Sequence, residues 1–159
     1  MSKLANLYIG RAGQMAVMAE YLIRGYNVAI PEVDVGDDIF VVRDSDGEYA
    51  RIQVKTTNAT ETRRGYSARY TLKLAQLESP STPETWYVFV NRLQEKWESF
   101  IVIPRQELHD LYELHQIGSL SQNNTLSLYF SYADGKITCS AQDLTTYLNN
   151  WNGWPSIQH

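Results

Sequence analysis

Apolar side chains at helical spacing near the start of the chain predict a first helix. Residues 11–24 carry these side chains on one helical face (Met15, Met18, Ala19, Leu22 and Ile23). Gly25 follows as a C-terminal stop, and residues 26–30 predict a strand that Pro31 ends. A helix followed directly by a strand therefore opens the fold.

Two apolar-rich runs on either side of Asp46-Gly47 predict a β-hairpin. The runs span residues 36–42 and 49–57, and an Asp-Gly pair between alternating hydrophobic residues is a strong hairpin signal. A two-residue turn at Asp46-Gly47 and a four-residue loop at 45–48 both predict the same pairing, with Asp38 opposite Lys55 and Phe40 opposite Gln53.

This register gathers polar side chains on one sheet face. Because side chains alternate between faces, Asp38 shares a face with Arg51, Gln53 and Lys55, and a slip of one residue would separate them. An ordinary cross-strand ion pair beside a polar glutamine is one interpretation. The β-branched neighbours of Gln53 and Lys55 favour a central strand. Burying a lysine there lowers stability unless the side chain has an ionic partner or a function.

The rest of the chain predicts a scaffold. The expected elements are strands at 85–90 and 99–103, a helix at 106–116, a second hairpin at 126–130 and 136–139, and a short closing helix at 141–149. Trp151 and Trp154 follow, and we expect them in the core or in an oligomer contact. His109 and His115 are six residues apart on a predicted helix, so they face different ways and complete no zinc set.

Length and composition indicate one globular domain over residues 1–159. The chain has 159 residues, of which 43% are hydrophobic and 20% charged, enough for a substantial core. The single cysteine, Cys139, cannot form an internal disulfide, and no apolar run reaches signal-peptide or membrane-span length. We therefore expect a cytoplasmic protein.

The distribution of charge favours nucleic acid in spite of a net charge of -4. Residues 51–75 hold six basic side chains against Glu61 alone, a local charge of +5 that leaves -9 elsewhere. Cationic and hydroxyl side chains are common phosphate contacts, and tyrosines stack on unpaired bases. A solvated loop and edge strand is the alternative. Our predicted DNA-binding residues are Arg51, Arg63, Arg64, Arg69 and Lys73.

The order of these features resembles the PD-(D/E)XK nuclease superfamily. That superfamily has an Asp at the start of its second strand and an acid or amide two residues before a Lys on its third. Asp38, Gln53 and Lys55 match these positions, in a Gln-x-Lys form similar to that of group I intron homing endonucleases. The segment from Gly10 to the Gly25-Tyr26 turn is similar to archaeal Holliday junction resolvases, so the resemblance covers about residues 8–57.

The resemblance implies a three-layer α/β sandwich with a central mixed β-sheet flanked by helices. It also implies an endonuclease of homing, junction-resolving or defence type, which acts on double-stranded or branched DNA with Mg²⁺ or Mn²⁺. Asp38, the Gln53 side-chain oxygen and the Val54 backbone carbonyl would bind the metal, and Lys55 would orient water or stabilise the transition state. A homodimer or homotetramer is the implied assembly.

The first helix departs from the superfamily pattern. Members often carry a Glu where this chain has Gln14, so the chain has neutral amides at two positions that are usually acidic. Glu20 is a possible substitute, although it points some 120° away from Gln14 on a helix. Nearer acids (Glu32, Asp34 and Asp37) could contribute through water. A catalytically inactive domain that binds DNA or a protein partner is the alternative, and no motif supports a cofactor-dependent enzyme.

Overall fold

The computed structural model describes residues 2–151. The helices are α1 (Lys3–Ile23), α2 (Leu74–Glu78), α3 (Arg105–His115) and the 3-10 helix η1 (Thr145–Tyr147). The strands are β1 (Asn27–Ala29), β2 (Ile39–Val42), β3 (Tyr49–Asn58), β4 (Thr60–Thr62), β5 (Gly65–Lys73), β6 (Thr85–Leu93), β7 (Lys96–Pro104), β8 (Ser119–Leu120), β9 (Thr125–Ala133), β10 (Lys136–Cys139) and β11 (Gln142–Asp143). None of the described helices is long and apolar enough to cross a membrane.

A five-stranded mixed sheet lies at the centre of the fold, with the order β1-β2-β3-β6-β7. Strand β3 is the middle strand, parallel to β6 and antiparallel to β2. The predicted central position of the Gln53 and Lys55 strand and the predicted mixed sheet are therefore confirmed. The predicted strands at 26–30, 85–90 and 99–103 correspond to β1, β6 and β7.

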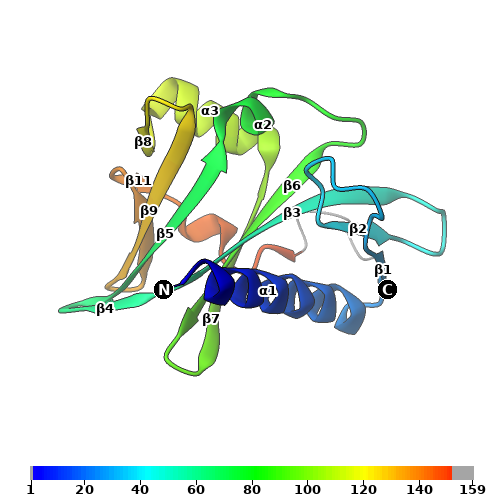
Figure 1. Ribbon diagram of the computed structural model, residues 1–159, viewed down its shortest axis with the longest axis horizontal. Coiled ribbons are helices and arrows are strands. Elements are labelled where there is room, and N and C mark those ends of the chain that lie inside the picture. Colours follow the sequence, from blue (N-terminus) through cyan, green and yellow to red (C-terminus); the bar gives the residue numbers. More distant parts are fainter. Residues whose placement is uncertain (1, 152–159) are drawn as a thin grey trace.

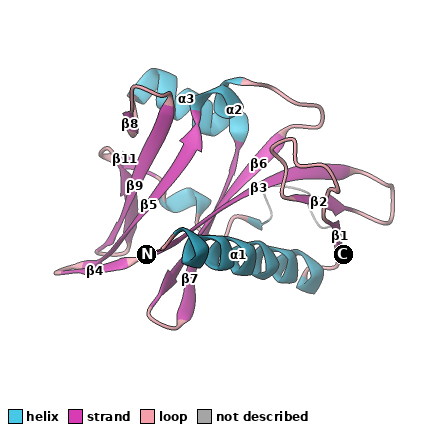
Figure 2. Ribbon diagram, viewed as in Figure 1, coloured by secondary structure: helices cyan, strands magenta, loops and turns pink. Residues whose placement is uncertain are grey.

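Different layers cover the two faces of this sheet (Figures 1 and 2). Val17 and Tyr21 of α1 pack on one face, in a cluster that contains Ile52 and Val88. The other face meets a second, antiparallel sheet with the order β11-β10-β9-β5-β4, together with α2 and α3. The α/β sandwich with flanking helices is thus confirmed. The predicted hairpin at 126–130 and 136–139 is also confirmed as β9 and β10, and its pairing with β5 forms a strand layer that the sequence did not predict.

Helix α1 begins at Lys3, well before the predicted start at residue 11. The Ser2 hydroxyl caps it by accepting a hydrogen bond from the Ala5 N–H at 3.2 Å. At the other end the expected stop is confirmed, because Gly25 has a φ of 88° and the Tyr26 N–H donates to the Tyr21 carbonyl at 3.1 Å.

The hairpin register differs by two residues from the prediction. Ile39 pairs with Ile52, so Asp38 lies opposite Gln53 rather than Lys55. The cause is a loop at 44–47, closed by the Arg43 N–H bond to the Glu48 carbonyl at 2.8 Å. Because the shift is even, the predicted common face for Asp38, Gln53 and Lys55 is retained.

The predicted closing helix at 141–149 is wrong. Ser140 and Ala141 have positive φ values of 48° and 67°, so the chain turns there and β11 pairs back on β10 before the short η1 turn. Trp151 is 3% exposed and contacts Tyr21 with its ring centroid 5.2 Å away, which places it in the core. Trp154 lies outside the described residues.

Candidate active site

Asp38 lies at the point where β2 begins beside β3. Its backbone N–H donates to the Ile52 carbonyl at 2.8 Å. Its side-chain Oδ2 accepts two hydrogen bonds at 2.7 Å each, from Gln53 Nε2 and from the Val54 N–H. Asp38 is therefore fixed by the strand that carries the other predicted site residues.

Gln53 leaves one buried oxygen without a partner. The residue is 7% exposed, and its Oε1 has no hydrogen-bond partner among the described residues. Buried polar atoms are normally satisfied, so an orphaned acceptor indicates an ion or water position. The N–H and carbonyl of a strand residue point to the same side, so the Val54 carbonyl opens toward the side on which Asp38 lies.

Lys55 follows on the same face of β3 and is half-buried. Burial lowers the pKa of its ammonium, while Asp38 and Asp34 favour the charged form. Burial likewise raises the pKa of the Asp38 carboxyl, against the opposing effects of the Val54 N–H and Lys55. The pair forms no ion pair within 4 Å in the described structure, so each charge is still available to a third group.

Gln14 reaches this site from helix α1. Its Nε2 donates to the Asp38 backbone carbonyl at 2.6 Å, and its Oε1 accepts from Arg11 at 2.6 Å. Gly13 permits this approach, because a Cβ at that position would lie 2.0 Å from Thr56 Oγ1. Sequence reasoning missed Arg11, although its spacing of three residues from Gln14 on a helix was the available signal.

The acids near Asp38 come from the loop before β2 rather than from α1. Glu20 pairs with Arg24 toward the end of α1, about 9 Å along the helix axis from Gln14. Asp34 and Asp37 both act on the Asp38 carboxyl and raise its pKa. Asp34 is exposed and accepts from the Gly36 N–H at 3.0 Å. No cluster of three or more His, Cys, Asp or Glu suited to a metal occurs within residues 2–151.

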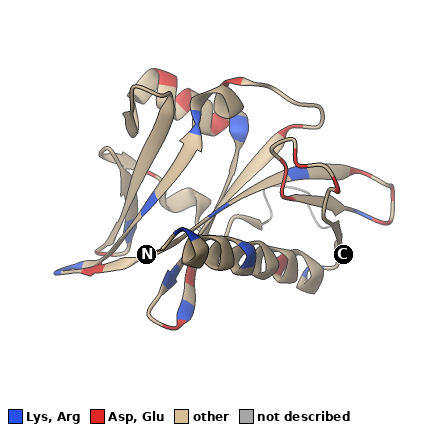
Figure 3. Ribbon diagram, viewed as in Figure 1, with Lys and Arg blue, Asp and Glu red and all other residues tan. Residues whose placement is uncertain are grey.

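The predicted DNA-binding residues fall into two groups. Arg51 donates to the buried Asp37 carboxylate at 2.7 Å, so it is tied into the fold. The other four residues are exposed on the second sheet, at the β4–β5 turn and along β5 (Arg63, Arg64, Arg69 and Lys73). These four residues form what we call the basic row, and blue segments mark Lys and Arg along this part of the ribbon in Figure 3. Arg69 of this row lines the same pocket as Lys55, and Lys73 also lowers the pKa of Lys55.

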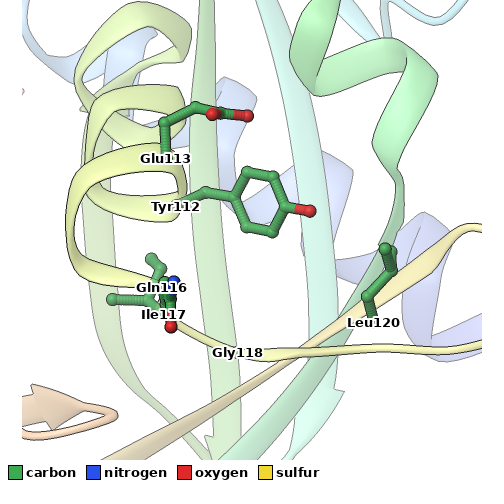
Figure 4. Close-up of a pocket in the computed structure, with 6 residues that line it drawn as sticks. All are labelled: Tyr112, Glu113, Gln116, Ile117, Gly118 and Leu120. Carbon is green, nitrogen blue, oxygen red and sulfur yellow. The ribbon is translucent and has the colours of Figure 1, made fainter.

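Three pockets help to define the surroundings. One, of about 340 Å³, lies between the start of α1, β3 and β5 and includes Lys55 in its lining. Another, of about 350 Å³, lies between the loop before β2 and α2, with Arg51 in its wall. A third, of about 390 Å³, lies at the end of α3 between Tyr112 and Leu120 and includes no predicted site residue (Figure 4).

Comparison with known proteins supports the fold. No family model matches the chain, and no curated protein sequence matches it. A bacterial homing endonuclease, I-Ssp6803I, superposes with a TM-score of 0.51 at 18% identity, covering 91% of this chain and 86% of its own. Hjc, a Holliday junction resolvase from Archaeoglobus fulgidus, has a TM-score of 0.47 at 13% identity, covering 74% and 81%. The chain therefore shares its fold with this homing endonuclease.

Proposed function

We propose that this protein is a metal-dependent DNA endonuclease. Its active site, formed by Asp38, Gln53 and Lys55, would hydrolyse phosphodiester bonds. The observation that carries the proposal is the buried Gln53 Oε1, which has no partner among the described residues and lies on the residue that donates to Asp38 Oδ2. A carboxylate, an amide oxygen without a partner and an ammonium gathered on one face of the central sheet would lower stability unless they had a function.

The oxygen donors fit Mg²⁺ or Mn²⁺. Asp38 would supply the anionic ligand, with Gln53 Oε1 and the Val54 carbonyl as neutral ligands. Mg²⁺ is commonly held by one or two carboxylates with water and substrate phosphate completing its shell, so this set is sufficient. Such an ion polarises the phosphoryl oxygen and makes water a better nucleophile.

Lys55 and Gln14 would have different tasks. Lys55 is the ammonium among the predicted catalytic residues, so it would stabilise the negative charge that develops on the phosphate. Gln14 holds the Asp38 backbone through its Nε2 and is itself held by Arg11, so it acts as a positioning residue. The exposed row from Arg63 to Lys73 would contact DNA phosphates.

A catalytically inactive binding domain is the second candidate, and one observation favours it. Both Gln14 and Gln53 are neutral where carboxylates are usual, and the described residues hold no cluster of three metal-ligating side chains. Lower ligand charge weakens the affinity for hard cations. Under this alternative the fold and the basic row are used for binding alone.

Metal-dependent cleavage separates the two candidates. Purified protein with Mg²⁺ or Mn²⁺ is incubated with supercoiled plasmid, nicked plasmid and branched DNA, with a chelator as the blank. We expect the wild-type protein to cleave DNA. Asp38→Ala and Lys55→Ala should each lower the cleavage rate by at least about 10²-fold, the usual effect of losing a transition-state contact. Asp44→Ala and Lys96→Ala, at exposed positions outside the site, are the matched controls.

The outcomes are distinct. Wild-type rates in either site variant would remove that residue from the mechanism. Wild-type protein that shifts DNA on a gel but cuts none of these substrates with either metal would support the binding domain instead. Circular dichroism of each variant establishes that a lost activity is not a lost fold.

We also propose that two copies act together, as a homodimer or a homotetramer, because cutting both strands of a duplex takes two sites. Helix α1 supplies apolar surface for such a contact, since Leu7 is 66% and Tyr8 is 71% exposed. Trp151 cannot serve, because it is buried within its own chain. Light scattering gives the solution mass that tests this assembly.

A further inference from the structure

Two glycines in helix α1 differ in what surrounds them. Glycine in a helix interior costs about 1 kcal/mol relative to alanine, so each position calls for a reason. At Gly13 the reason is packing, because an added Cβ would clash with Thr56. At Gly10 an added Cβ would meet no atom within 4 Å outside the adjoining turns of the helix backbone. Packing within the chain therefore does not explain Gly10.

Gly10 lines the groove that leads to Lys55. The groove has a volume of about 340 Å³ and runs between Asn6, Ile9 and Gly10 of α1, residues 54–57 of β3 and residues 69–71 of β5. The side of β5 away from β9 pairs with β4 only at residues 65–67, so the rest of that edge is unpaired in the described structure and lies beside the groove. An open strand edge presents backbone N–H donors.

The groove has the chemistry of a phosphate-binding surface. Its charged lining residues, Lys55 and Arg69, are both cations, and its threonines and Asn6 add hydroxyl and amide groups. Arg69 is held in place, because its Nη2 donates to Ser127 Oγ at 3.1 Å and its guanidinium lies 5.4 Å from the Tyr129 ring. Fixed cations with neutral donors suit a phosphodiester backbone.

We propose that this groove carries one strand of the nucleic acid past Gly10 and Arg69 to Lys55. The inference rests on the proposed nuclease function and adds the route of the substrate. A volume of about 340 Å³ is at the small end of ligand sites, so the groove has room for a stretch of one strand and not for a duplex. The missing side chain at Gly10 then leaves space for the nucleic-acid strand rather than for another part of the protein.

A side chain at Gly10 tests this route without disturbing a contact of the described chain. Gly10→Glu places a carboxylate and added bulk in the groove, and Ala19→Glu makes the same change of charge at an exposed position elsewhere on α1. The probe is a fluorescent duplex with a single-stranded extension, and its affinity is measured by anisotropy in EDTA. We expect Gly10→Glu to weaken binding by at least about tenfold, since like charges repel at an interface, while Ala19→Glu binds as wild type does.

The result separates this inference from the proposed function, because binding in EDTA does not depend on catalysis. Gly10→Glu protein that is folded and binds with wild-type affinity would overturn the groove route, whatever Asp38→Ala does to cleavage. Weakened binding by Gly10→Glu in a protein that never cuts would support the route and refute the nuclease. Equal losses in Gly10→Glu and Ala19→Glu would also overturn it, because net charge would then explain both.

Discussion

At Asp38, burial and hydrogen bonding act on the carboxyl pKa in opposite directions. Burial is the larger effect and raises the pKa, while the Val54 N–H and Lys55 lower it. The ionised form is therefore incompletely satisfied by the protein alone. A bound cation would supply the missing interaction, and Gln53 Oε1 is the nearby atom that lacks a partner within the described residues.

We predict that Gln53→Glu increases the stabilisation that Mg²⁺ gives to the folded protein. The change adds ligand charge, which tightens the binding of hard cations, and ligand that binds only the folded state raises the melting temperature. Without metal the variant should melt below wild type, because it loses the Nε2 donor to Asp38 and places two carboxylates together. Differential scanning fluorimetry with and without Mg²⁺ measures both effects.

The control for this prediction is Gln122→Glu, at an exposed loop position. For wild type, the gain from Mg²⁺ should disappear as the pH falls through the raised Asp38 pKa, because the protonated carboxyl no longer binds the ion. The loss of Mg²⁺ stabilisation should begin at a higher pH than it would for a site built on a carboxylate of ordinary pKa. An equal response to Mg²⁺ in wild type, Gln53→Glu and Gln122→Glu would place Gln53 outside any cation site.

The common face of Asp38 and Gln53 could be predicted from the sequence, but their direct contact could not. Alternation along strands determines the face, and an even error in register leaves it unchanged. The register follows from the loop at 44–47, within which the Arg43 side chain donates to Asp46 at 2.9 Å and to Glu48 at 2.6 Å. Side-chain contacts within a loop leave no periodic signal in the sequence.

At the scale of elements, the contact between α1 and β3 determines how the helix reaches the site. Gly13 is buried against Thr56, and the next residue, Gln14, contacts the Asp38 backbone. The helix could be recognised from its apolar spacing, but the face that it buries could not. Gly13, Val17 and Tyr21 are buried, whereas Met15, Leu22 and Ile23 of the predicted apolar face are exposed by 50%, 52% and 79%.

We predict opposite effects on stability for alanine at the two glycines of α1. Gly13→Ala should lower the free energy of unfolding by about 1–3 kcal/mol, because the helix must move away from Thr56. Gly10→Ala should raise it by about 0.5–1 kcal/mol, because it improves helix propensity with no clash. Urea unfolding of the two variants and wild type gives both values.

The double variant Gly13→Ala with Thr56→Ala supplies the check on mechanism. Removing the Thr56 hydroxyl and methyl leaves only its Cβ near position 13, so part of the lost stability should return as a coupling between the sites. Strictly additive effects would mean that Gly13→Ala lowers stability for a reason other than its contact with Thr56 of β3.

The layer opposite α1 was the least predictable part of the fold. Ala68, Tyr70 and Leu72 alternate with exposed residues along β5, a pattern that also fits an isolated edge strand. Strand β5 belongs to a sheet because β9 pairs with it over residues 65–73, although β9 lies more than fifty positions later in the chain. Such long-range pairing has no local signal, and the positive φ at Ser140 and Ala141 that ended the predicted closing helix had none either.

At the scale of the whole molecule, the arrangement of charge matters more than the net charge of -4. The cations of residues 51–75 divide between structure and surface. Arg51 is 26% exposed and pairs with Asp37, which is 7% exposed. The exposed basic side chains of β5 and of the β4–β5 turn remain available to a partner. The basic residues of this one segment thus differ in their surroundings, since Arg51 is paired within the fold and the basic row is exposed.

We therefore predict that replacing these arginines separates DNA binding from stability. Arg63→Ala and Arg64→Ala should each reduce the slope of log affinity against log salt concentration by about one, because each removes a phosphate contact. Both variants should keep an unfolding free energy within about 0.5 kcal/mol of wild type, because the two side chains are exposed. Arg51→Ala should leave the salt slope unchanged and lower the unfolding free energy by about 1–3 kcal/mol, because it strands the Asp37 carboxylate in a buried position. Anisotropy titrations over a range of salt concentrations, together with urea unfolding, measure both quantities. A reduced salt slope in Arg51→Ala with unchanged stability would mean that Arg51 contacts DNA, and that its pairing with Asp37 gives way to the phosphate.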